Sequence, residues 1–119
     1  TITATAEGYD AEAHINFKTA SLPNVDLSGS TITATAEGDA GIEAHITFDE
    51  AKLAAANLSG SIITATADGS YSEAKIDFDE ANLVNASLSG STITAAANGS
   101  DSVAEVDFED ANLANADLS

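Results

Sequence analysis

One period of about 30 residues governs this chain and restricts the folds open to it more than any other feature. The phenylalanines mark the period, because 31, 30 and 30 residues separate Phe17, Phe48, Phe78 and Phe108. We divide the chain into one repeat domain of four units, 1–29, 30–60, 61–90 and 91–119, with an extra residue near Gly41. Such a period predicts that each unit buries its apolar side against its neighbours in a stack.

Within each unit the large apolar residues recur at steps of five. In the second unit the steps fall on Phe48, Leu53, Leu58 and Ile63. A step of five matches neither the helical period of 3.6 nor the strand period of 2. A small residue stands two positions before each large one, and a small polar residue stands directly before it, as in Ala81-Asn82-Leu83.

This A(D/N)LXX pattern resembles the motif of the pentapeptide-repeat family. The resemblance implies a right-handed quadrilateral β-solenoid, whose interior is filled by the Leu or Phe and by the small residue two positions earlier. It extends over most of each unit and recurs in all four units.

The pattern fails after each Ile, as in Thr66–Lys75, where Asp68 replaces the expected apolar residue. Alternating apolar and polar residues around a Gly-containing turn predict a hairpin-like insertion there. We therefore predict an all-β fold, a right-handed β-solenoid of four repeats with one side widened by two longer strands. The alternative is a ββα repeat array with a short helix over Asp49–Leu58, which Pro23 in the first unit disfavours.

Reading down the stacked units gives a predicted Thr face on one side of the solenoid. Its members are Thr1, Thr3, Thr5, Thr31, Thr33, Thr35, Thr64, Thr66, Thr92 and Thr94. Such ranks resemble the ice-binding surface of solenoid antifreeze proteins, and ice binding is therefore one alternative function. Thr is also a common residue of exposed strands, and Ile62 and Ala96 interrupt the ranks.

Acidic residues form two further ranks, directly after each Phe and one position later. These ranks are Asp49, Asp79 and Glu109, and then Glu50, Glu80 and Asp110. Stacked carboxylates repel one another, and calcium, which prefers oxygen ligands, is the one candidate ion for relieving this. No EF-hand loop is present, so the sequence carries no calcium-binding motif. The competing interpretation of these ranks is a solvated acidic face. No cofactor other than calcium is expected.

The first unit breaks the acidic ranks with Lys18 and Thr19. The net charges of the units are −3, −4, −4 and −6, which sum to the −17 of the whole chain. Neither terminal unit shows a capping helix, so the edges are expected to be open to further strands. A head-to-tail stack would place Lys18 and Thr19 against Glu109 and Asp110 of the next molecule, and would grow into an open filament.

These features predict a non-enzymatic structural repeat protein, self-assembling into an extracellular or cell-surface fibre, sheath or adhesin stalk. The charge argues against nucleic-acid partners, and no apolar run is long enough for membrane insertion. A second alternative comes from the family resemblance alone: some pentapeptide-repeat proteins mimic duplex DNA and act on type II topoisomerases. His14 and His45 share a column, followed by Lys75 and Glu105, so two imidazoles at most are available to one metal ion.

Overall fold

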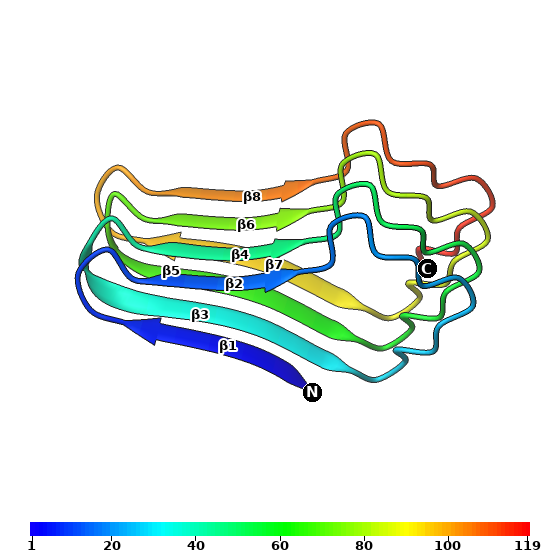
Figure 1. The fold of residues 1–119 in the computed structure, drawn as a ribbon, viewed down its shortest axis with the longest axis horizontal. Coiled ribbons are helices and arrows are strands. Elements are labelled where there is room, and N and C mark those ends of the chain that lie inside the picture. The colour runs from blue at the N-terminus through cyan, green and yellow to red at the C-terminus, as the bar shows by residue number, and fades with distance from the viewer.

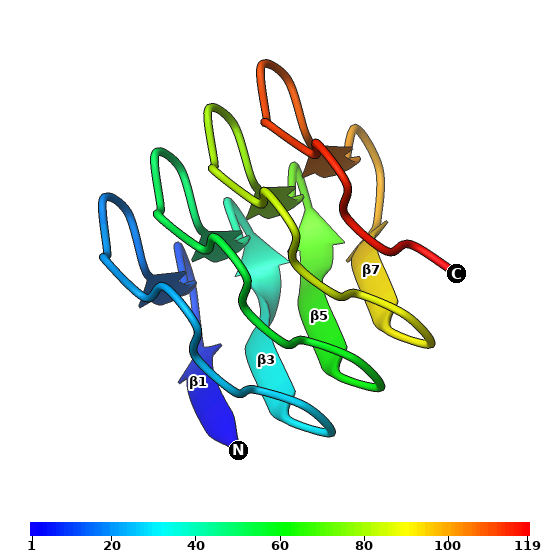
Figure 2. The ribbon, with the colours of Figure 1, turned by 90° about the vertical axis from the view of Figure 1, so that its right-hand side faces the viewer.

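The computed structural model describes all residues, 1–119, as an all-β solenoid (Figure 1). Its strands are β1 (Ile2–Glu7), β2 (Glu12–Asn16), β3 (Thr31–Ala40), β4 (Glu43–Thr47), β5 (Ile62–Ser70), β6 (Glu73–Asp77), β7 (Thr92–Asn98) and β8 (Val103–Asp107). They form two parallel 4-stranded sheets in the orders β1-β3-β5-β7 and β2-β4-β6-β8. Figure 2 shows the same path repeated coil after coil along the stack. The predicted fold class, an all-β solenoid, is confirmed.

The two strands of one unit do not form a hairpin, so that part of the prediction is wrong. β1 pairs in parallel with β3, and β2 pairs in parallel with β4. Alternation correctly predicted which residues are extended, but it does not say which strand supplies the hydrogen bonds. The two strands instead face each other across the interior, where small residues such as Ala34, Ala65 and Ala44 are completely buried.

The extra residue of the second unit is absorbed within a strand. The pairing of β3 with β5 is continuous up to Glu37 and Asp68, and it then shifts register before Ala40 pairs with Ser70. An added residue that bulges out in this way leaves the register on both sides intact.

No helix is present, so the ββα alternative is excluded. Over 49–58 the chain instead turns a corner every five residues. The Ala51 N–H donates to the Phe48 carbonyl at 2.8 Å, and the Ala56 N–H donates to the Leu53 carbonyl at 2.9 Å. These β-turns place the large residue of each pentapeptide inside the coil. The structure therefore also has no helix that is long and apolar enough to cross a membrane.

The core is a thin stack of identical layers. Phe17, Phe48, Phe78 and Phe108 form a ladder of stacked rings with centroids 4.8, 4.6 and 4.7 Å apart. Phe48 and Phe78 are fully buried in the middle of the stack. Phe17 and Phe108 are only partly buried, because each has a neighbouring coil on one side. Burial therefore decreases toward both ends of the solenoid.

Candidate functional site

The Thr ranks lie on the outer surface of the β1-β3-β5-β7 sheet. Thr3, Thr33, Thr64 and Thr94 occupy directly paired positions, and so do Thr5, Thr35 and Thr66. No segment covers this face, and its side chains are half-buried or exposed. Ile62 interrupts the face with 48% of its surface exposed, and Ala96 pairs with Thr66.

The acidic ranks lie at the first corner of each coil. Glu50, Glu80 and Asp110 have positive φ values of 55°, 52° and 51°, and Thr19 occupies the same place with 57°. Their side chains are exposed, whereas Asp49 and Asp79 are half-buried. No three of these six carboxylates converge within coordinating distance of one another. Calcium binding by them stays a prediction.

Lys18 is already engaged within the chain. Its ammonium forms an ion pair with Asp49 of the next coil and lies 3.8 Å from a Glu50 carboxylate oxygen. The hydrogen bond to Asp49, together with the charge of that carboxylate, raises the pKa of Lys18. Within one molecule, Lys18 of the first coil thus forms an ion pair with the acidic residue at the matching position of the next coil.

The two end coils expose hydrogen-bonding groups that are paired in every interior coil. The Leu83 N–H donates to the Asn112 carbonyl at 2.9 Å, and the Leu88 N–H donates to the Asp117 carbonyl at 2.8 Å. The equivalent groups of the last coil, the N–H groups of Leu113 and Leu118, have no backbone partner. Both ends of the solenoid are therefore open strand edges.

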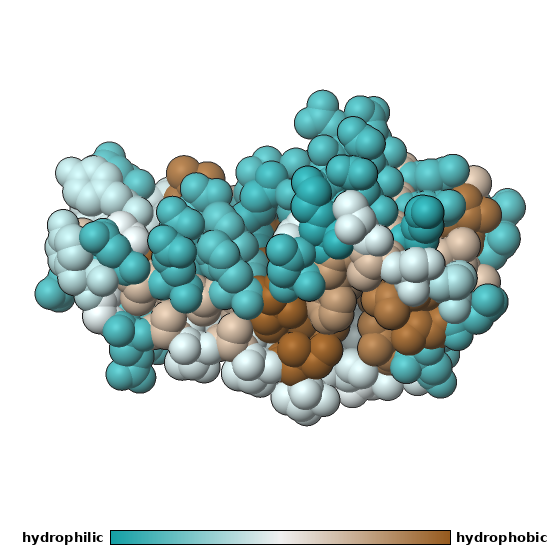
Figure 3. Space-filling view, viewed as in Figure 1, coloured by the Kyte–Doolittle hydropathy of each residue, from teal (hydrophilic) through white to brown (hydrophobic).

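Apolar side chains also reach the surface at the ends. Ile2 is 39% exposed in the first coil, and Val106 and Leu118 are 39% and 61% exposed in the last. Figure 3 shows apolar atoms coming to the surface at the lower side, where Figure 1 places the start of β1, beneath a largely hydrophilic upper side.

The side chains along the two open edges differ in charge. On the outer face of the β2-β4-β6-β8 sheet, the first coil carries Glu12, His14 and Asn16, and Lys18 follows β2. At the matching positions the last coil carries Val103, Glu105, Asp107 and Glu109. One edge thus combines a Lys and a His with a single acid, and the other is acidic.

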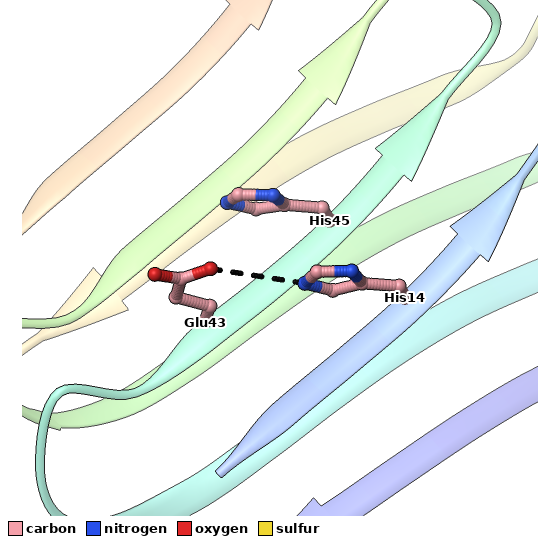
Figure 4. Close-up of side chains that lie close together, drawn as sticks. All are labelled: His14, Glu43 and His45. Atoms are coloured by element: carbon pink, nitrogen blue, oxygen red, sulfur yellow. Dashed lines mark ion pairs between the residues drawn. The ribbon is translucent and has the colours of Figure 1, made fainter. Parts of the chain in front are cut away.

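The same sheet face holds the cluster that has the right side chains for a transition metal. The His14 and His45 rings stack with centroids 5.0 Å apart and an interplanar angle of 6°. Glu43, two residues before His45 on β4, brings a carboxylate oxygen to 3.8 Å from His14 Nε2 (Figure 4). One ligand atom from each of the three residues lies within 4.8 Å of the others.

The sequence predicted the stacked imidazoles but missed Glu43. The signal was present, because Glu43 and His45 are two apart on a strand and therefore share a face.

A pocket of about 100 Å³ adjoins the two His residues, and Lys75 is among the residues that line it. The Lys75 ammonium is 3.5 Å from carboxylate oxygens of both Asp77 and Asp107. Burial by itself would lower the pKa of Lys75, but the charges of Asp77, Glu105 and Asp107 outweigh it and raise the pKa. The Lys75 charge is thus compensated by its own acidic neighbours.

In comparisons with known proteins, the sequence matches no family model, and it matches none of the curated proteins.

Proposed function

We propose that this protein is a structural repeat protein whose molecules assemble head to tail into a filament. The proposal rests on one observation: the two end coils present, unpaired, the same backbone groups that join one coil to the next inside the molecule. The fibre would act as an extracellular or cell-surface sheath or adhesin stalk, without catalytic activity. Membership in the pentapeptide-repeat family is part of the proposal, supported by the A(D/N)LXX corners.

The backbone supports this assembly because the free groups at the two ends are complementary. If another copy continues the stack, the Leu113 N–H meets the Ser21 carbonyl of that copy, as Leu83 meets Asn112 within the chain. In the opposite direction the Ser21 N–H meets the Ala111 carbonyl, as Asn112 meets Ala81 at 2.9 Å. Pairing of open parallel edges satisfies hydrogen-bonding groups that only water otherwise satisfies.

The charges support the same orientation. Continuing the stack places Glu109 beside Lys18 and Glu105 beside His14 of the neighbouring copy. Lys18 then lies between Glu109 of one molecule and Asp49 of its own. Side-by-side association, in contrast, would bring together surfaces of a chain with a net charge of −17.

A glycine in the first coil offers a sharp test. A Cβ at Gly38 would overlap the Gly8 carbonyl oxygen, and a Cβ at Gly69 would lie 2.5 Å from the Gly38 carbonyl oxygen. At Gly8 itself a Cβ meets nothing within 4 Å, since its coil has a neighbour on the other side only within residues 1–119. In a filament, that Cβ would point at the Gly99 carbonyl of the preceding copy. Gly8→Ala should therefore block stacking.

The control is Gly29→Ala, which also adds a methyl group at positive φ in the first coil, at +63° against +125° for Gly8, but faces open space. Electron microscopy and light scattering should show filaments for the wild type and Gly29→Ala, and monomers for Gly8→Ala. Circular dichroism checks that both variants fold. Lys18→Glu is a second variant, expected to weaken assembly by repulsion from Glu109 and Asp110. A wild-type chain that stays monomeric, with calcium or with a chelator, contradicts the proposal.

Calcium is the proposed ion for the acidic ranks, and the same measurement tests it. If calcium bridges Asp49, Asp79 and Glu109, filaments should form at a lower protein concentration with calcium than with magnesium at equal ionic strength, because calcium accepts more oxygen ligands in irregular geometry. If filaments form at the same protein concentration in calcium and in magnesium, the ions act only by screening the acidic charges, and calcium has no specific site.

The second candidate function is ice binding, favoured by the uncovered and in-register Thr face. Its ranks are separated by the strand spacing of about 4.8 Å, and alternate residues along a strand by about 7 Å. Thermal hysteresis and ice recrystallisation assays test it. Thr64→Tyr at the centre of the face should abolish activity, whereas Glu73→Tyr on the opposite sheet should not. A wild-type chain without either activity excludes this candidate.

A further inference from the structure

We propose that His14, His45 and Glu43 form a binding site for one divalent transition-metal ion, with zinc as the expected ion. The site lies on the outer face of β2 and β4, away from the acidic corner ranks. It goes beyond the proposed filament and does not depend on it, since all three ligands belong to one chain.

The three ligand atoms lie close enough together for one ion. Around a tetrahedral zinc ion with bonds of about 2.0 to 2.1 Å, two ligand atoms are separated by about 3.3 Å. The His14 Nε2 and Glu43 Oε2 atoms are 3.8 Å apart, and all three ligand atoms lie within 4.8 Å. Each imidazole lone pair lies in the plane of its own ring, so His14 must rotate out of its stack with His45, and Glu43 must turn with it, for one ion to be bound. Both side chains have room to move, because they are 46% and 44% exposed.

His45 supplies an independent indication. Its Nε2 atom is buried and has no hydrogen-bond partner. The Glu73 carboxylate oxygen lies 3.3 Å from this atom, at ion-pair distance, but forms no hydrogen bond with it. A buried polar atom without a partner costs free energy, and it requires an explanation in a native structure. A metal ion in the plane of the His45 ring, on its Nε2 side, would accept the Nε2 lone pair and remove this cost.

The chemistry of the ligands selects the class of metal. Two imidazole nitrogens and one carboxylate are a ligand set typical of zinc and neighbouring transition metals, whereas calcium and magnesium prefer oxygen ligands. The exposed side of the cluster is open to solvent, so a water molecule would supply the fourth ligand. Lys75 does not oppose the cation, because Asp77 and Asp107 compensate its charge.

A bound ion would join the first coil to the second. His14 comes from β2, and Glu43 and His45 come from β4, which are adjacent strands in the sheet. The first coil has an open edge, so it has the most to gain from this link. A ligand that binds only the folded state raises its stability in proportion to the logarithm of the ligand concentration. Zinc should therefore protect the first coil from fraying.

The experiment is a titration of the full 119-residue chain with zinc chloride, at a concentration where sedimentation shows monomers. Calorimetry and competition with a chromophoric chelator should give one zinc per chain. His14→Gln and His45→Gln should each lower the zinc affinity by more than about tenfold, because the loss of even an outer-shell partner of a ligand typically costs about that much. Glu43→Gln should lower it by less, since the amide oxygen remains a weak ligand.

The matched control is Glu37→Gln, which removes the same charge from an exposed position of β3 on the other sheet, and its zinc affinity should equal that of the wild type. Zinc should also raise the Tm of the wild type, and this rise should disappear in His45→Gln. Unchanged affinity in either His variant, an equal loss in Glu37→Gln, or one zinc shared by two chains would each overturn the proposal.

Discussion

At the scale of single residues, the polar residue of each pentapeptide holds the corner of the coil. The Asn16 side chain accepts a hydrogen bond from the Lys18 N–H at 2.8 Å, and the Asp107 side chain accepts one from the Glu109 N–H at 2.8 Å. Thr47 does the same for Asp49 at 3.2 Å. Asn, Asp and Thr all supply an oxygen at this position. This explains why the motif has a short polar residue directly before each Leu or Phe.

Asp26 makes this contact testable by pH. Hydrogen bonds from the Ser28 hydroxyl and N–H lower the pKa of Asp26 below its ordinary value of 3.8. The resulting stabilisation is fully present above pH 3.8 and is lost as the pH falls through the lower folded pKa. Asp26→Ala should reduce stability at neutral pH. Asp26→Asn, which keeps the oxygen, should stay near the wild type at neutral pH and show a weaker acid dependence.

Urea unfolding between neutral pH and pH 2 would measure both variants of Asp26. The side-chain oxygen at the corner would have no stabilising role if Asp26→Ala unfolded at the wild-type urea concentration throughout that range.

The phenylalanine ladder gives a second prediction at the residue scale. Phe48 is fully buried between two other rings, whereas Phe108 stacks on one ring only. Phe48→Ala should therefore lower the free energy of unfolding by about 3 to 5 kcal/mol. Phe108→Ala should cost clearly less, because part of its ring is already in contact with water. Denaturant unfolding followed by circular dichroism compares the two, and equal losses would contradict the ladder.

At the scale of elements, the sequence predicted the coils well and the strand partners poorly. The resemblance of the five-residue pattern to the pentapeptide motif implied the corners, and alternation predicted extended strands on both sides of each Gly-containing turn. The hairpin was wrong because alternation is a property of one strand, whereas pairing is decided between coils by the contacts that the repeat brings into register. The Thr and His columns followed from the period alone. Glu43 was missed because it meets His14 diagonally, across two coils.

The bend between the two sheets requires a glycine at position 38, because the backbone of the neighbouring coil comes too close for a side chain. Gly38 has no positive φ, yet a Cβ there would overlap the Gly8 carbonyl oxygen and lie 2.8 Å from the Ile42 Cδ1 atom. Gly38→Ala should cost about 3 kcal/mol, near the upper end for overpacking, because backbone atoms cannot yield as side chains do. Gly60→Ala, with φ of +65° but open space, should cost about 1 to 2 kcal/mol.

The midpoints of denaturant unfolding for the two glycine variants check this order. If the two variants were equally stable, the first and second coils could move apart at this bend to make room for the Gly38→Ala methyl group. That result would contradict the tight stacking of the strands.

At the scale of the whole molecule, the solenoid has a direction. The net charge of the units changes from −3 in the first to −6 in the last. Lys18 lies in the first coil, and the last coil has no Lys or Arg. Contacts between such ends are heterologous: each molecule uses one surface to bind its predecessor and a different surface to bind its successor. Variants that block one end should therefore leave the other end active.

This direction leads to a prediction for mixtures. Gly8→Ala blocks the N-terminal edge but keeps the C-terminal one, so a small fraction of it should bind filament ends and shorten wild-type filaments. A chain with Glu109→Lys and Asp110→Lys has the opposite defect, because its C-terminal edge repels Lys18. Each variant alone should stay monomeric, and their mixture should form dimers of twice the 11.9 kDa chain mass. Analytical ultracentrifugation distinguishes these species. In a head-to-tail contact, the intact C-terminal edge of Gly8→Ala can bind the intact N-terminal edge of the other variant. A mixture that remained monomeric would therefore contradict this contact. Gly8→Ala chains that formed long filaments would contradict it as well.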